Sequence, residues 1–213
     1  MKLTNLIWVL ALAGAVAACN SGSPITGVDP PDPGTGGTGG TAGSPGTGGT
    51  GGTGGATEGA CTDDANQAVY DQLDYVNDGG EASSGTEAAS AIASDCVRGS
   101  SVSMPPVAGC GAEVAALIPC ATATPPSCSA EEVQVLATCV EECTQSTIEE
   151  ITGSMLSNDC MGCYGNSVSC GVAFCTVPCL NSTVAPECIA CRCDNGCTGG
   201  FETCTGFATN DCG

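Results

Sequence analysis

Apolar and polar residues divide the chain into three stretches with different patterns. An apolar run from Leu6 to Ala13 lies close to the N-terminus, and residues 20–60 carry few large apolar side chains. Beyond Cys61, apolar residues recur three or four positions apart, which is the spacing of one helical face. No stretch alternates convincingly with a period of two. The pattern therefore predicts an all-α domain of small, disulfide-rich helical hairpins with irregular connections.

Start and stop signals place the helices within this domain. The first helix is expected from Thr62 to the glycines Gly79-Gly80, because apolar residues follow Thr62 at helical spacing. A capping box, Ser129-Ala-Glu-Glu132, starts a helix that continues through Cys143, and Thr147-Ile-Glu-Glu150 repeats its form. The other expected helices cover about 86–98 and 113–118, the latter ending before Pro119.

The N-terminal apolar run has the form of an export signal. Met1-Lys2 supplies a positive start, and Val16-Ala-Ala-Cys19 has the form of a bacterial lipobox. The run is too short for a membrane-spanning helix, which needs about 20 apolar residues. We expect residues 1–18 to be removed as a lipoprotein signal peptide and Cys19 to carry lipid. The alternative is an ordinary secreted protein that is cut near Ala18 and keeps Cys19 as a free thiol.

The segment after the predicted signal is a linker. Thr-Gly-Gly repeats between Thr35 and Gly55 give it great backbone freedom and nothing to bury, so the sequence predicts disorder. Residues 19–60 are thus interpreted as a lipid-anchored disordered linker. Residues 61–128 are interpreted as a helical region that contains cysteines, and 129–213 as a repeat of Cys-rich helical hairpins.

Charge and composition exclude several classes of function. The chain has 3 basic and 23 acidic residues and no histidine. Nucleic-acid binding depends on Lys and Arg against phosphate, so we expect no nucleic-acid partner. Lys2 would leave with the signal, which removes the last lysine, and most catalytic triads and dyads need His or Lys. We therefore expect no enzyme, no catalytic residue and no cofactor.

The cysteine count supports both the lipid and a disulfide scaffold. Setting Cys19 aside from the 19 cysteines leaves 18, all between Cys61 and Cys212, an even number as disulfides require. An exported chain meets an oxidising compartment, where disulfides persist. The four cysteines from Cys188 to Cys197 leave two alternatives open, a metal site and a redox pair at Cys191-x-Cys193. We expect no bound metal.

The later cysteines repeat their spacing. Residues 137–170 and 173–197 are two degenerate copies, in each of which two cysteines four apart precede two cysteines three apart. Cysteines at these spacings share one face of a helix, so two antiparallel helices can be joined by two bridges. Sequence alone does not fix connectivity. The hypothesis, which resembles the twin-cysteine helical hairpins of small mitochondrial intermembrane-space chaperones in spacing only, pairs Cys139 with Cys163, Cys143 with Cys160, Cys175 with Cys191, and Cys179 with Cys188.

The chain resembles the Cys-rich lipoproteins of myxobacteria and related bacteria in its combination of a lipobox, a Thr-Gly-Gly linker and a Cys-rich C-terminal part. The residues that carry this resemblance are Val16–Cys19, Thr35–Gly55, Cys160–Cys163, Cys188–Cys191 and Phe201–Cys204. The resemblance implies no activity. By analogy with outer-membrane lipoproteins, Asn20 after the lipidated cysteine implies sorting to the outer membrane. We expect the protein to face outward there, with the periplasmic face as the alternative.

These features predict a lipid-anchored cell-envelope protein. Its expected contacts are the membrane, through lipid at Cys19, and a protein or cell-surface partner. The disulfide-stapled module would then serve structure, adhesion or protein binding without catalysis. The alternative is a small-ligand or metal-binding protein, or a thiol–disulfide redox protein.

Overall fold

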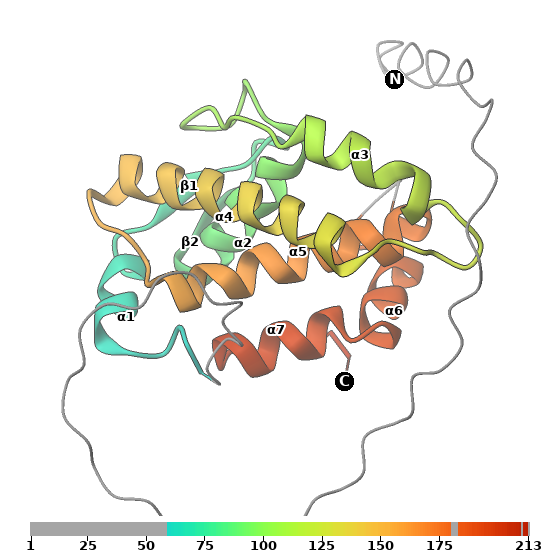
Figure 1. Ribbon diagram of the computed structural model, residues 1–213. Coiled ribbons are helices and arrows are strands. Elements are labelled where there is room, and N and C mark those ends of the chain that lie inside the picture. Colours follow the sequence, from blue (N-terminus) through green and yellow to red (C-terminus); the bar gives the residue numbers. More distant parts are fainter. Residues whose placement is uncertain (1–58, 180–182, 210, 213) are drawn as a thin grey trace, which may run out of the picture. The chain divides into compact units, whose positions relative to one another are not determined.

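The computed structural model describes residues 59–179, 183–209, 211 and 212 (Figure 1). The predicted signal peptide, Cys19 with its lipid, Asn20 and almost all of the linker lie outside the described residues. Among the described helices, none combines the length and the apolar character that crossing a membrane requires.

The described residues form an all-α domain with one small β-hairpin, which confirms the predicted fold class. The elements are α1 (Asp64–Tyr70), β1 (Asp74–Val76), β2 (Ala82–Ser84), α2 (Gly85–Arg98), α3 (Gly111–Ala121), α4 (Ala130–Thr152), α5 (Asn158–Cys179), α6 (Pro186–Asp194) and α7 (Cys197–Thr205).

The first helix is shorter than predicted. Asp63 caps the start of helix α1, where its side chain accepts a hydrogen bond from the Asn66 N–H, but the helix ends at Tyr70. Leu73 and Tyr75 are both buried although they are two positions apart, which suits a strand and not a helix. Strand β1 therefore replaces the last predicted turns and pairs with β2, with Tyr75 opposite Ser83.

Helix α4 forms with the predicted capping box. The Ser129 hydroxyl accepts from the Glu132 N–H at 3.3 Å, and a Glu132 carboxylate oxygen accepts from the Ser129 N–H at 2.8 Å. The helix runs past Cys143 to Thr152, so Thr147 starts no new helix. Its hydroxyl instead donates to the Cys143 carbonyl inside α4. Gly153, with φ 69°, ends the helix in the left-handed conformation that glycine favours.

Helix α5 lies at the centre of the domain, with α4 packed on one side and α7 on the other (Figure 1). Gly165 lies very close to α4, because a Cβ at this position would come within 2.5 Å of Glu141 Cγ and 2.7 Å of the Ala137 carbonyl oxygen. Glycine at this position lets the two backbones come together. On the other side of α5, Tyr164 packs edge-to-face against Phe201 of α7.

The beginning of the domain is bound to its end. The N–H groups of Gly59, Ala60 and Cys61 donate in turn to the carbonyls of residues 203, 204 and 205, at 3.1, 2.8 and 3.3 Å. These are the last carbonyls of α7, which have no partner within the helix. The incoming chain therefore completes the C-terminus of the last helix.

A buried pair of tyrosines joins α1 to α5. The hydroxyls of Tyr70 and Tyr164 lie 3.0 Å apart, and Tyr70 packs edge-to-face against Phe207. Burial raises the pKa of Tyr164 to about 12 and raises the pKa of Tyr70 further, so both rings stay neutral. Together with Phe201 and Phe207 they supply most of the aromatic packing in the domain.

Candidate functional site

Every cysteine from Cys61 onward is in a disulfide, and the bonds total nine. Their pairs are Cys61–Cys160, Cys96–Cys143, Cys110–Cys139, Cys120–Cys128, Cys163–Cys204, Cys170–Cys197, Cys175–Cys191, Cys179–Cys188 and Cys193–Cys212. Three of them join the regions 61–128 and 129–213. Because such bonds persist in oxidising compartments, this set indicates an extracytoplasmic location.

The second copy of the repeat forms the bridges expected of it. Cys175 pairs with Cys191 and Cys179 with Cys188, between the end of α5 and helix α6. A non-helical backbone at Cys175, with φ −121° and ψ 15°, bends α5 there. The two short helical segments beyond the bend are then joined by two bonds, as the i,i+4 and i,i+3 spacings predict.

The pairs expected in the first copy are wrong. Cys139 bonds to Cys110 and Cys143 to Cys96, whereas Cys160 bonds to Cys61 and Cys163 to Cys204. The reason is the rotation of each helix about its own axis. On α4, Ala137 and Glu141 face α5. Cys139 and Cys143 each follow one of them by two residues, or about 200° of helical rotation, so both cysteines lie on the opposite side of α4 from α5.

The same rotation holds on α5. Gly165 faces α4, and Cys163 is about 200° away from it on the helical wheel. Both cysteine pairs thus face outward from the α4–α5 contact, where other elements come to meet them. Helices α2 and α3 bond to α4, and α7 bonds to α5.

A signal for two of the missed bonds is present in the sequence. Cys163 and Cys170 are seven residues apart, and so are Cys197 and Cys204. Seven residues make about two turns, so both pairs sit on one face of their helix and can bridge an antiparallel partner twice. The structure contains these bonds, Cys163–Cys204 and Cys170–Cys197. No local spacing in the sequence predicts the Cys61–Cys160 bond, because its two cysteines are 99 positions apart.

A pocket of about 570 Å³ lies along these two bridges, between α5 and α7. We call it the α5–α7 groove. Asn166 and Ser167 line it from α5, and Gly199, Gly200 and Thr203 line it from α7. A Cβ added at either glycine would meet no atom within 4 Å. The groove is therefore open above the α7 backbone, with amide and hydroxyl side chains at its sides.

The lining of the α5–α7 groove, all of it described, holds no charged side chain. The groove is thus a neutral surface on a chain whose formal net charge is −20. Glu202, next to a lining residue, turns its carboxylate to the backbone N–H and hydroxyl of Thr209, at 2.8 and 2.7 Å. The lining that the groove exposes is mostly apolar, so it suits an uncharged ligand with a largely apolar surface and a few groups that hydrogen-bond to the amide and hydroxyl side chains.

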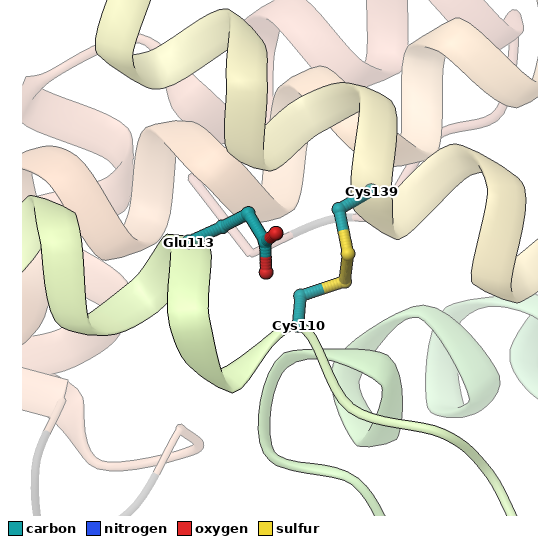
Figure 2. Close-up of side chains that lie close together, drawn as sticks. All are labelled: Cys110, Glu113 and Cys139. Atoms are coloured by element: carbon teal, nitrogen blue, oxygen red, sulfur yellow. A yellow bond between two sulfur atoms is a disulfide. The ribbon is translucent and has the colours of Figure 1, made fainter.

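A second cluster has the composition of a metal site. Cys110, Glu113 and Cys139 place their potential ligand atoms within 4.8 Å of one another, and the two sulfurs form a disulfide beside the Glu113 carboxylate (Figure 2). A metal is bound by thiolates, not by a disulfide. The cluster can therefore offer thiolate ligands only after the Cys110–Cys139 bond is reduced.

The four cysteines from Cys188 to Cys197 do not act together. Each is bonded to a different partner elsewhere, namely Cys179, Cys175, Cys212 and Cys170. Cys191 and Cys193, the candidate redox pair, are thus not bonded to each other. They lie close in sequence because both belong to α6, which disulfides join to different parts of the domain.

Sequence and structure comparisons add no relative from which a role could be carried over. No protein-family model, no curated protein and no solved structure matches this chain.

Proposed function

We propose that this chain is a lipid-anchored protein of the cell envelope, held by lipid at Cys19 in the outer membrane with its domain facing outward. The domain is a binding module, structural or adhesive, and the α5–α7 groove receives an uncharged segment of a partner protein. The observation that carries the proposal is this neutral groove, built on two disulfides in a strongly acidic chain.

The available chemistry supports binding over catalysis. The chain has no histidine, and every cysteine from Cys61 onward is bonded in a disulfide and so offers no thiol. The tyrosine hydroxyls of Tyr70 and Tyr164 are buried with pKa values raised by burial, which makes them poor acids or bases near neutral pH. A rigid scaffold with a preformed groove loses little conformational entropy on binding.

Anchoring is tested by fractionation of the expressing bacterium. The wild-type chain should be recovered with outer membranes, should incorporate labelled fatty acid and should be accessible to surface proteolysis on intact cells. Cys19→Ala should abolish the fatty-acid label and move the domain to a soluble extracytoplasmic fraction. Fatty-acid label retained in Cys19→Ala would contradict lipidation at that residue, and a domain protected on intact cells would favour the periplasmic face.

Binding at the groove is tested with matched variants. Gly200→Glu adds a charged side chain to the groove, whereas Gly171→Glu adds the same side chain to α5 outside the lining, where it also meets open space. Proteins captured by the domain from intact cell surfaces should be lost with Gly200→Glu and retained with Gly171→Glu. Equal capture by both variants would exclude the groove as the binding site.

The Cys110–Glu113–Cys139 cluster supports a second candidate function, zinc binding in the reduced protein. The observation in its favour is the distance of 4.8 Å or less among the three ligand atoms. Titration of thiols in the purified native domain decides between the two. No free thiol and no zinc uptake supports the binding module, whereas two reactive thiols that are protected by zinc support the metal site.

A further inference from the structure

We propose that the disulfides route mechanical force past most of the domain, so that a pull through the N-terminal linker leaves the fold intact. This inference rests on the proposed function, in which the linker is a tether under load. It follows from which cysteines are bonded, and from where along the chain the tether enters.

The tether enters at a covalent junction. Residues 59–61 are held by three backbone hydrogen bonds to the end of α7, and Cys61 is bonded to Cys160 of α5. Once a pull breaks the hydrogen bonds, the next link is a covalent bond. The partners of that bond are 99 positions apart, so the chain from Cys61 to Cys160 forms a loop that the force bypasses.

A second bond continues the route. Cys163 lies three residues after Cys160 and is bonded to Cys204, across a separation of 41 positions. Force thus passes from Cys61 to Cys160, along one turn of α5, and on to Cys204 near the C-terminus. Helices α1 to α4 lie in the first bypassed loop, and most of α5, all of α6 and most of α7 lie in the second.

The α5–α7 groove lies beside this route, since Cys163 and Cys204 both line it. A partner held in the groove is therefore connected to the tether by two disulfides and one turn of helix. Load between the partner and the lipid crosses none of the apolar packing between α2, α3 and α4. The binding surface keeps its shape under a force that would unfold an unbridged helical domain.

The extension of the domain under force tests this inference. In the oxidised chain, the path from Cys61 to the C-terminus extends to roughly 5 nm at most, at about 3.5 Å per residue. In the fully reduced chain the same segment extends to roughly 50 nm. The experiment pulls the full purified chain between handles at its two ends, with and without a thiol reductant, and measures the contour length released beyond the linker.

Two matched variants locate the route. Replacing both Cys61 and Cys160 by Ala diverts the force through the Cys96–Cys143 bond, and the extended path grows to roughly 20 nm. Replacing both Cys120 and Cys128 by Ala also removes one disulfide, but that bond lies inside the first bypassed loop, so the path stays at roughly 5 nm.

Release of less than about 5 nm from the oxidised wild-type chain, rising to several tens of nanometres on reduction, supports the inference. Release of tens of nanometres from the oxidised wild-type chain overturns it, and so does an equal increase in both double variants. The measurement uses purified protein and needs neither lipid nor partner. The fractionation and capture experiments can therefore fail while the force experiment succeeds, and the reverse.

Discussion

The two ends of the domain are stabilised by different means. Around α2, α3 and α4, large apolar side chains are fully buried, among them Ile92, Leu117, Leu136 and Ile148. From Cys170 onward, the buried apolar residues of the described part are small: Ala173, Cys175, Cys188 and Cys197. That end holds four disulfides within itself. Cross-links thus replace a core where the sequence has too few large apolar residues to build one.

The largest difference between the two ends is expected on reduction. Each disulfide contributes about 2–4 kcal/mol, so the end that lacks a large apolar core loses most of its stability. In a thiol reductant, the amides of α6 and α7 should lose protection from hydrogen exchange before those of α2 and α4. Equal loss of protection in all four helices would show that the apolar core depends on the disulfides as much as the C-terminal end does.

Truncating a core side chain tests the other end. Leu136→Ala should lower the free energy of unfolding by about 2–5 kcal/mol, because it leaves a cavity among fully buried neighbours. The adjacent Val135 is 56% exposed, so Val135→Ala is the matched control and should change the stability by less than about 0.5 kcal/mol. Urea unfolding with the disulfides intact measures both. Similar effects would mean that α4 contributes no apolar core.

The contact of α4 with the part of α5 that leads into the C-terminal end depends on one glycine. Gly165→Ala should destabilise the domain by about 1–3 kcal/mol, because the new Cβ would overlap Glu141 and the Ala137 carbonyl. Gly171→Ala, on the same helix with open space around it, should stabilise by about 0.5–1 kcal/mol. Thermal unfolding of the two variants should therefore move in opposite directions. A shift of the same sign would mean that α4 and α5 adjust their distance freely.

The smallest effect concerns the carboxylate at this contact. Burial, with Glu142 beside it, raises the pKa of Glu141. A raised pKa contributes stability below the unfolded value of about 4.3, and that stability is lost as the pH rises through the folded value. Glu141→Gln should therefore gain stability relative to wild type between pH 4 and pH 7, by less than about 1 kcal/mol because the side chain is partly exposed.

Glu132 is the internal control for this pH dependence. Its hydrogen bonds with the backbone and side chain of Ser129 lower the pKa of its carboxyl, so its contribution has the opposite sign. It is present above the unfolded pKa and is lost on acidification. Unfolding curves of Glu132→Gln and Glu141→Gln against pH should diverge in opposite directions from wild type. Parallel curves would contradict the burial of Glu141.

Local patterns predicted much of the fold, and long-range contacts account for what they missed. The capping box at Ser129 and the bridges between Cys175, Cys179 and α6 depend on neighbours in the chain, and both formed. The first helix failed after Tyr70, because burial of Tyr75 against α2 decided the conformation there. The hydroxyl of Tyr75 donates to Asp95 at 2.9 Å, a contact that the spacing of Val69, Leu73 and Val76 does not reveal.

The candidate site was harder to predict than the fold. Repeated spacing suggested that Cys139 and Cys143 pair within their own copy, but helix rotation is set by Gly165 and its close approach to α4. The α5–α7 groove joins lining residues on its two sides that are at least 26 positions apart, and only the matched spacing of Cys163 with Cys170 and of Cys197 with Cys204 indicates it. A pocket whose walls come from two helices depends on how those helices pack, and no local sequence pattern records that packing.

The hydrogen bonds from residues 59–61 to the last turn of α7 have a consequence for biogenesis. The first residues of the domain to be synthesised find these partners only after the last ones have been made. Cys96 and Cys110 both come before Cys160, the partner of Cys61, so pairing in order of appearance would give the wrong bonds. The native set of bonds therefore does not follow the order of the cysteines in the chain, and the domain closes only after residues 203–205 have joined it.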